Sequence, residues 1–459
     1  MSLQTPVKIR TFQRKLYFKA KAEPDFRFYL LYDKIHRADI LLHAYRLAKA
    51  NGGSAGVDGM TFEHVESAGV DEWLSGIRKE LRAKAYNPQP VLRVMIPKPG
   101  GGRRPLGIPT IKDRVIQTAA KLVLEPIFEA DLEPNAYGYR PRRSALDAIR
   151  TVHELLCKGY TDVVDADLSK YFDTIPHSEL MQCIARRIVD RHVLRLIKLW
   201  LKVPVENRDK GGRGQMSGGR KSRKGTPQGG VISPLLANLY MNRFLRFWRV
   251  KGCNEVFRAQ VVSYADDFVI LSRGKADEAL QWTSAVMDRL ELKLNQDKTV
   301  VRNAYTGNFD FLGYTFGRIW FRKDGSWYIG ASPSKASVKR LKQKVRIMLN
   351  PGEKGVWPDV RDRLNALLRG WGTYFCYGTT QIAYRAVERN VYNRVRRFLV
   401  CRHKVRSRGI HRFPSERVFG ELGVILPRPR KYAARLSLIH ISEPTRPRLV
   451  SRMPSSAGK

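Results

Sequence analysis

The chain has 459 residues, and its 84 lysines and arginines outnumber its 42 aspartates and glutamates, which gives a formal charge of +42. A hydrophobic content of 43%, with 19 phenylalanines and 19 tyrosines, excludes a disordered basic tail and predicts two or three folded domains. So large a positive excess attracts polyanions, and nucleic acid is therefore the expected partner.

Neither a secretory signal nor an apolar stretch of about 18 residues occurs, so we expect no membrane partner. The expected location is the cytoplasm of a bacterium, in association with nucleic acid, or the nucleus or an organelle of a eukaryote. The five cysteines lie far apart, with no Cys-x-x-Cys pair and no histidine at zinc-ligand spacing. This spacing disfavours a zinc module and a disulfide framework.

Residues 1–85 are predicted to form a helical extension with a basic loop, because apolar residues such as Ile40 and Leu47 recur at helical spacing. From Val91 an extended run leads into a glycine-rich turn that carries Lys98 and Arg104, which predicts a β-hairpin. Further helices are expected over 114–128 and 144–158.

The alternating residues 162–167 predict a strand that ends at Asp167. Residues 207–224 are rich in Gly, Lys and Arg and nearly free of apolar side chains, which predicts a mobile basic loop. Ser233 as N-cap and Pro234 as first helical residue then predict a helix that runs to about Trp248.

Residues 264–267 place two adjacent carboxylates, Asp266 and Asp267, between short apolar runs. Because β-branched and aromatic residues favour strands and Asp favours turns, we predict a β-hairpin with both carboxylates near its tip. Like charges held this close repel unless a cation lies between them, which favours a divalent ion with oxygen ligands. Taken alone, the tetrapeptide is equally well explained as a surface turn.

Two-metal nucleotidyl transfer needs carboxylates that hold a pair of divalent ions about 3.5–4 Å apart. Asp167 at a strand end, with Asp266 and Asp267 at a hairpin tip further along the chain, form the trio that we predict to be catalytic. Of the two adjacent carboxylates, Asp266 is the stronger candidate for a metal ligand and Asp267 the weaker. Two Mg²⁺ ions are expected because of cellular abundance, and Mn²⁺ is the alternative with the same ligands.

Two apolar stripes in the C-terminal part, with residues 338–349, predict a three-helix bundle over residues 335–400 that has a basic outer face. The stripes consist of Val360, Leu364, Leu367, Leu368 and Trp371, and of Ile382, Ala386, Val387, Val391 and Val395. A basic segment follows over residues 401–435. Residues 436–459 resemble a translated sequencing-library adapter. We interpret this segment as an artefact and exclude it from the predicted fold.

In their order and spacing, these motifs resemble the reverse transcriptases and maturases encoded by group II introns. The matching segments are residues 104–109, 137–141, 167–173, 225–238, 264–267, 298–299, 311–314 and 368–375. One such motif is weak evidence for a family, whereas eight motifs in the same order are specific to it.

The resemblance implies an α+β fold of the right-hand polymerase type. Fingers and palm with an antiparallel sheet would occupy residues 86–320, followed by an α-helical thumb or maturase domain over 335–400. The implied function is RNA-directed DNA polymerisation, together with binding of group II intron RNA to assist splicing and mobility. The implied partners are that intron RNA, an RNA template with a DNA primer, and deoxynucleoside triphosphates. The oligomeric state stays open, with a homodimer as one option.

Carried over residue by residue, the resemblance assigns metal ligation to Asp167, Asp266, Asp267 and the backbone carbonyl of Leu168. Phe172 would lie under the incoming sugar and exclude a 2′-hydroxyl; without the family it is also explained as a core aromatic. The remaining roles are triphosphate contacts by Lys98 and Arg104, a nucleotide contact by Gln228, pyrophosphate assistance by Lys298, and a grip on the primer end by Gly313 and Tyr314.

Two alternatives remain at this point. One is a splicing maturase that binds intron RNA without polymerising, although the intact Asp167, Asp266 and Asp267 favour an active polymerase. The other is a reverse transcriptase of the retron, diversity-generating or CRISPR-associated kind. The segment around Trp371 and the long N-terminal extension favour the intron type. The cysteine spacing offers no sign of the zinc-dependent endonuclease that some relatives append.

Overall fold

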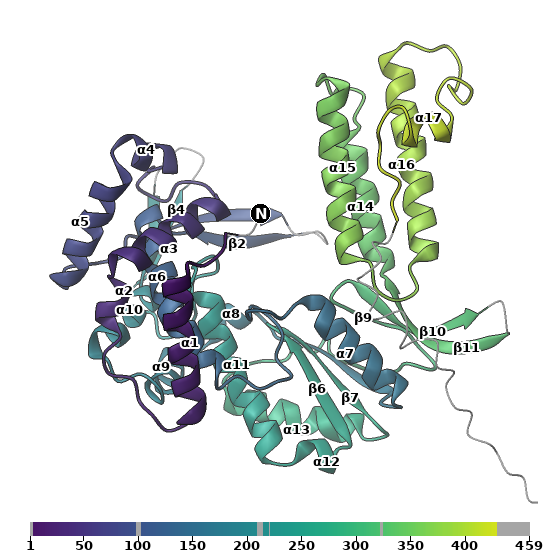
Figure 1. The fold of residues 1–459 in the computed structure, drawn as a ribbon. Coiled ribbons are helices and arrows are strands. Elements are labelled where there is room, and N and C mark those ends of the chain that lie inside the picture. Colours follow the sequence, from purple (N-terminus) through teal and green to yellow (C-terminus); the bar gives the residue numbers. More distant parts are fainter. Residues whose placement is uncertain (1–2, 98–101, 209–213, 220, 322–324, 429–459) are drawn as a thin grey trace, which may run out of the picture. The chain divides into compact units, whose positions relative to one another are not determined.

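The structure is a computed structural model that describes residues 3–97, 102–208, 214–219, 221–321 and 325–428. The chain divides into two compact units, Met1–Gly330 and Ala331–Lys459, whose elements are drawn in Figure 1. The predictions made for Lys98 and for residues 436–459 lie outside the described residues, as does the end of the basic segment from residue 429.

Three of the N-terminal helices, α1 (Val7–Ala22), α2 (Tyr32–Ile35) and α3 (Ala38–Asn51), pack against one buried helix, α6 (Ile111–Glu129). Helix α6 is buried around most of its circumference, which is typical of a helix in the centre of a large core. The predicted N-terminal helices are present as α1, α2 and α3, together with α4 (Phe62–Ser67) and α5 (Val70–Arg82).

A four-stranded sheet in the order β2-β1-β4-β5 contains the predicted fingers hairpin. Its members are β1 (Val91–Pro97), β2 (Arg103–Ile108), β4 (Pro204–Arg208) and β5 (Gly214–Gly218). The interpretation of 207–224 as one loop was wrong, because β5 pairs with β4 across an antiparallel hairpin. Pairing of this kind uses backbone groups, so a sheet edge forms here without apolar side chains. Strands β1 and β4 are parallel, so this sheet is mixed.

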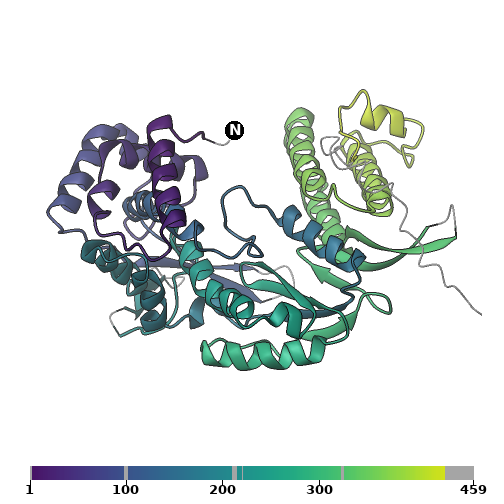
Figure 2. The same ribbon diagram turned by 60° about the horizontal axis from the view of Figure 1, so that its bottom comes forward.

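The central sheet of the first unit has the order β6-β7-β3-β8 and is antiparallel throughout, as predicted for the palm. Its strands are β3 (Asp162–Asp167), β6 (Ala259–Tyr264), β7 (Asp267–Ser272) and β8 (Val300–Asn303). In β7 every residue after Asp267 is buried, since helices cover the sheet (Figure 2). The helices that contact it are α7 (Ala145–Cys157), α12 (Cys253–Val256) and α13 (Ala276–Arg289).

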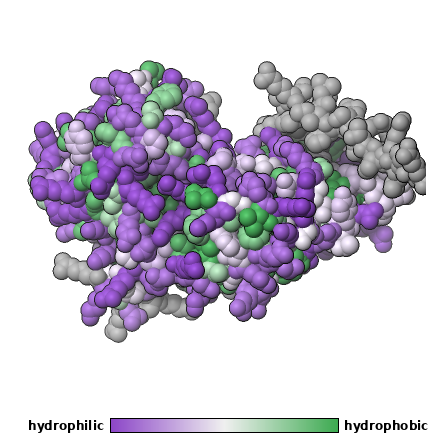
Figure 3. Space-filling view, turned by 90° about the horizontal axis from the view of Figure 1, so that it is seen from below, coloured by the Kyte–Doolittle hydropathy of each residue, from purple (hydrophilic) through white to green (hydrophobic). Residues whose placement is uncertain are grey.

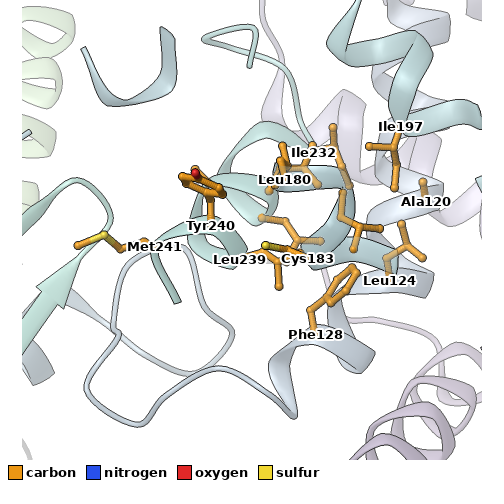
Figure 4. Packing of buried hydrophobic residues seen from close by; sticks show 14 of the residues in the cluster. Ala120, Leu124, Phe128, Leu180, Cys183, Ile197, Ile232, Leu239, Tyr240 and Met241 are labelled. Carbon is orange, nitrogen blue, oxygen red and sulfur yellow. The ribbon is translucent and has the colours of Figure 1, made fainter. Parts of the chain in front are cut away.

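Helix α11 (Ser233–Val250) contacts α6, and its Phe244 packs against Phe268 of β7 at 5.6 Å between ring centroids, so it links the central sheet to the core around α6. Leu239 and Tyr240 of α11 pack near Leu180 and Cys183 of α9 (His177–Ala185), as Figure 4 shows. The prediction of Ser233 as N-cap was wrong, because Ser233 is already helical and Ile232 precedes the helix without a side-chain cap. The Ser233 hydroxyl instead donates to the Pro227 carbonyl at 2.8 Å, which ties the helix to the turn before it. The remaining helices of this unit are α8 (Tyr171–Thr174) and α10 (Arg191–Leu201).

A three-stranded sheet, in the order β11-β10-β9, precedes the C-terminal helices. It consists of β9 (Phe309–Phe311), β10 (Tyr314–Phe321) and β11 (Ser326–Pro333). In the second unit, α14 contacts both α15 and α16, which confirms the predicted three-helix bundle. The helices are α14 (Lys335–Met348), α15 (Trp357–Tyr374), α16 (Gln381–Arg402) and the short α17 (Ser415–Phe419).

One residue of the predicted stripes was placed wrongly. Ile382 is 76% exposed, whereas Tyr384, Val387 and Val391 are buried. Ile382 lies two residues before Tyr384, and two residues rotate a helix by just over half a turn, so its side chain leaves the bundle. Among the described helices, none is both long and apolar enough to cross a membrane.

Candidate functional site

The predicted hairpin at 264–267 is present residue for residue. Tyr264 pairs with Asp267 across β6 and β7, so Ala265 and Asp266 form a two-residue loop. Ala265 has a φ of +60°, a conformation that such a turn normally gives to glycine. An alanine held there is strained, and this strain persists because surrounding contacts fix the backbone.

The segment around Gly138 supplies those contacts. The Tyr137 N–H donates to the Ser263 carbonyl at 2.8 Å, so this segment runs beside the end of β6. A Cβ at Gly138 would overlap the backbone nitrogen of Ala265. The Asn238 side-chain amide donates to the Gly138 carbonyl at 2.6 Å. The motif at 137–141 therefore holds the carboxylate-bearing turn, a role that the sequence analysis did not assign.

The strand register places the predicted carboxylates together. Asp167 lies opposite Asp267 in the β3–β7 pair, and directly paired residues of an antiparallel sheet point to the same face. Asp266 is the next residue, in the turn. Asp165 is two residues before Asp167, so it lies on the same face of β3. This fourth carboxylate was not predicted from the sequence.

Burial and mutual repulsion shift the acidities of these groups. Burial raises the pKa of Asp266, and the charge of Asp167 adds to the effect. Asp267 reaches solvent at the end of β7, yet partial burial and the charges of Asp266, Asp167 and Asp165 raise its pKa to about 6. Burial also raises the pKa of Asp165 to about 6. Four carboxylates crowded in this way favour a bound cation.

Lys298 contributes the one ammonium group that contacts Asp167 in the described part of the chain. Its Nζ donates to Asp167 Oδ2 at 2.8 Å, and this bond raises the pKa of Lys298. The same loop is fixed by the Asn295 N–H, which donates to the Asp167 carbonyl at 2.8 Å. Leu168 is buried and forms a bridge to Leu294, so the backbone after Asp167 is also held.

The donor set fits a hard divalent ion in its chemistry, since Asp167, Asp266 and Asp267 offer only carboxylate oxygens. Within the described ranges, no three His, Cys, Asp or Glu side chains are already arranged as a ligand set. Lys298 Nζ contacts Asp167 Oδ2 in this arrangement, and that oxygen would have to be free to bind a metal ion. Metal ligation by these residues and by the Leu168 carbonyl therefore stays a prediction.

Arg104 and Gln228, from the fingers hairpin and the Pro-Gln-Gly turn, contact each other. Arg104 Nε donates to Gln228 Oε1 at 3.2 Å. Gln228 Nε2 donates to both carboxylate oxygens of Asp173 at 3.2 Å. Asp173 was missed by the sequence analysis, although it ends the segment 167–173 that carried the resemblance. The Arg104–Gln228–Asp173 chain brings three separate segments together.

The backbones of these segments also meet closely. The Gly107 N–H donates to the Gln228 carbonyl at 2.5 Å. Gly229 has a φ of +109°, and a Cβ there would overlap the Gly107 carbonyl oxygen. Glycine is therefore required at this position of the turn. The fingers strand β2 and the Pro-Gln-Gly turn are thereby fixed as one surface.

Phe172 lies at the start of α8, just after β3. Its side chain is 6% exposed and packs edge-on against Tyr171 at 5.7 Å between ring centroids. The Phe172 carbonyl accepts from the Thr226 N–H at 2.7 Å, so the backbone of Phe172 lies next to the turn that carries Gln228. Its contact with the incoming sugar stays a prediction.

The predicted primer grip is the turn between β9 and β10. Leu312 and Gly313 have φ values of +49° and +80° and form a two-residue loop between Phe311 and Tyr314. Tyr314 is fully buried, and its contact with the primer end stays a prediction. Gly313 is partly exposed, and a primer contact by its backbone stays a prediction.

Comparisons with known proteins identify both parts of the chain. Residues 96–316 match the family described as reverse transcriptase (RNA-dependent DNA polymerase). Residues 338–413 match the maturase-specific domain of group II introns. Protein YkfC of Escherichia coli strain K12 is 35% identical over 382 residues, which cover 74% of this chain and 98% of YkfC. The chain belongs to the group II intron reverse transcriptase and maturase family.

Two further relatives of this family are longer than the chain. The group II intron-encoded protein LtrA of Lactococcus lactis is 28% identical over 348 residues, covering 62% of this chain and 56% of LtrA. An uncharacterised 91 kDa protein in the cob intron of Schizosaccharomyces pombe is 25% identical over 419 residues, covering 75% of this chain and 50% of that protein. The chain thus spans about half the length of these two relatives. A solved telomerase of Candida albicans matches with 15% identity and a TM-score of 0.40, over 78% of this chain and 68% of the telomerase chain.

Proposed function

We propose that this reverse transcriptase-family protein is an RNA-directed DNA polymerase that also binds group II intron RNA and assists its splicing and mobility. One observation carries the polymerase part. The β3–β7 register sets Asp167 opposite Asp267, beside Asp266 in a strained turn, and burial raises the pKa values of Asp266 and Asp267. A surface turn that served only to reverse the chain would gain nothing from carboxylates crowded at this point.

In the proposed mechanism, Asp167, Asp266 and Asp267 hold two Mg²⁺ ions, with the Leu168 carbonyl assisting. When bound, the ions would supply positive charge to the primer 3′-hydroxyl and to the departing pyrophosphate. Lys298 has a side chain that is 66% exposed, so it can move from Asp167 to a phosphate oxygen. Mn²⁺ offers the same ligation chemistry.

The residues around Gln228 position the nucleotide in this proposal. Arg104 is exposed on β2 and can pair with the triphosphate, as guanidinium groups do. Gln228 presents its amide next to Arg104, and the ring of Phe172 closes the space below the sugar. Lys98, which lies outside the described residues, is predicted from the sequence to add a second cation.

RNA binding is supported by charge and by the second unit. The chain carries a formal charge of +42, and α16 exposes Arg385, Arg389 and Arg397 on the face away from its buried residues. Guanidinium groups on such a face suit phosphate contacts. A maturase that binds RNA without polymerising is the second candidate, and the intact carboxylate trio favours the first.

A double variant separates these two functions. Asp266→Ala with Asp267→Ala should abolish primer extension on an RNA template with deoxynucleotides, because no metal ligands remain in the turn. Splicing of a bound group II intron RNA should largely persist, since RNA contacts lie elsewhere. Both are measured on the full chain, with thermal unfolding as the check on folding. Unchanged primer extension would show that the catalytic assignment is wrong.

A further inference from the structure

A basic groove lies between the C-terminal halves of α11 and α13 and the end of α9. It has a volume of about 460 Å³ and is lined by Arg186, Arg243, Arg246 and Arg289 around Phe247 and Leu290. Figure 3 views the molecule from the side on which α11 and α13 lie in Figure 1, and it shows hydrophobic patches set among hydrophilic side chains. We call this feature the α11–α13 groove.

Three of the four guanidinium groups in this groove are not neutralised. Arg243 pairs with Glu179 at 3.0 Å. Arg186, Arg246 and Arg289 are exposed, and no hydrogen bond or ion pair joins their guanidinium groups to another described residue. The carboxylate of Asp131 acts on Arg246 from a distance but is ion-paired with Arg187. Unpaired cations around one hollow repel each other, and an anion in the hollow relieves that repulsion.

The floor of the groove is rigid and aromatic. Phe247 stacks on Trp282 of α13 with 5.6 Å between ring centroids and 18° between planes. The Tyr240 hydroxyl donates to the Leu290 carbonyl at 2.8 Å, which joins α11 to the end of α13. The groove is therefore preformed by helices, and binding would cost little ordering of the protein.

The groove is separate from the turn that carries Gln228, where we propose that the nucleotide binds. Helix α11 begins at the turn that carries Gln228, and Arg246 lies twelve positions after Pro234. At 1.5 Å per residue, this is about 18 Å along the helix. A ligand in the groove can thus be bound while the site at the start of α11 is occupied.

We propose that the α11–α13 groove binds a single-stranded segment of RNA, with phosphates on Arg186, Arg246 and Arg289 and a base against Phe247. Guanidinium forks match phosphate oxygens, and aromatic rings accept any base by stacking. The volume is sufficient for a nucleotide. An acidic protein segment would use the same charges but would have less use for the aromatic floor. The proposal goes beyond polymerase activity, since it requires no catalytic residue.

The test uses the full chain with Arg186→Gln, Arg246→Gln and Arg289→Gln combined. The matched control combines Arg78→Gln, Arg82→Gln and Arg195→Gln, three exposed arginines on α5 and α10. The probe is a fluorescent single-stranded RNA of about 20 nucleotides, longer than the roughly 4–16 nucleotides that one single-strand-binding module covers. It is added after saturation with an unlabelled template–primer duplex, so that the catalytic cleft does not contribute. Binding is measured by anisotropy at several salt concentrations.

We expect the groove variant to lose about tenfold or more in affinity, and its slope of log K against log salt to become shallower by about 2, because three phosphate contacts are lost. The control should lose less than about threefold. Phe247→Leu should weaken binding about tenfold while leaving the slope unchanged, because stacking releases no counterions. Thermal unfolding verifies that each variant is folded.

Equal RNA binding by the groove variant and its control would overturn the proposal. So would a groove variant that keeps RNA binding but loses binding of a fluorescent polyglutamate peptide, since the groove would then take an acidic protein. Primer extension on saturating template–primer should stay within about twofold of the unaltered chain. Failure of this proposal is therefore distinguishable from failure of the polymerase assignment.

Discussion

At the residue scale, the orientation of the Gln228 side chain is set by its two charged neighbours. Asp173 can only accept hydrogen bonds when ionised, so the Gln228 NH₂ group turns toward it. The carbonyl oxygen of the same amide then faces Arg104. Asp173 thus acts as a positioning residue for the surface on which we propose the nucleotide binds.

Removal of that carboxylate tests the positioning role. Asp173→Ala should raise KM for deoxynucleotides about tenfold with kcat changed less than about threefold, because substrate alignment rather than chemistry is affected. In a double-mutant cycle, Asp173→Ala should add nothing to the loss caused by Gln228→Ala, since both changes remove one unit. If the effects of the two substitutions were fully additive, Asp173 would act independently of Gln228. Steady-state primer extension supplies these constants.

Phe172 is predicted to select the sugar through the volume of its ring. Phe172→Val should raise incorporation of ribonucleotides relative to deoxynucleotides by at least about tenfold, because space opens for a 2′-hydroxyl. Phe128→Val is the matched control, since Phe128 is a fully buried core residue on α6. Both variants lose core packing, but only the first should change the ratio. An unchanged ratio would leave Phe172 as a core residue alone.

At the element scale, strand β3 carries two carboxylates on one face, Asp165 and Asp167. The inner one, Asp165, lowers the stability of the folded chain when it is ionised. Asp165 has a pKa of about 6 because it is partly buried and lies near Asp167 and Asp310, with Arg302 offsetting part of the effect. An unfolded aspartate has a pKa of about 3.9, so the folded chain binds this proton more tightly. Stability should therefore fall as pH rises from about 4 to about 6 and then level off.

Asp165→Asn should remove part of that pH dependence. At pH 7.5 and without divalent ions, we expect the variant to be more stable by on the order of 1 kcal/mol, after allowance for solvent screening. At pH 4 the two proteins should unfold at similar urea concentrations, because Asp165 is then protonated in the folded state. Urea unfolding at both pH values provides the comparison. A variant that is less stable at pH 7.5 would contradict this account of β3.

Most elements near the site were predictable because their signals are local. The β6–β7 hairpin follows from strand formers on both sides of a polar pair, and the loop bounds agree with the prediction. Strand β5 was missed because its pairing with β4 depends on the backbone and not on side-chain type. The start of α11 was placed one residue late because the Ser233 hydroxyl bonds to Pro227 instead of capping the helix.

At the scale of the whole molecule, the part of the site that escaped the sequence analysis consists of long-range contacts. Gly138 meets the turn at Ala265, and Asp173 meets Gln228, although each pair is far apart in the chain. No periodicity or local motif encodes such pairs. The carboxylate trio was predicted because its residues lie in motifs that carried the family resemblance, and the register then placed Asp167 beside Asp267.

The proposed polymerase site is tested most directly by single-turnover incorporation of one deoxynucleotide on an RNA template with Mg²⁺. Asp266→Asn keeps the size of the side chain and removes its charge, and Asp297→Asn makes the same change at an exposed position. We predict that Asp266→Asn slows incorporation about a thousandfold, the equivalent of about 4 kcal/mol in the barrier, because a metal ligand is lost. Asp297→Asn should stay within about twofold of the unaltered chain. Incorporation by Asp266→Asn within about tenfold of the unaltered chain would contradict the proposed site.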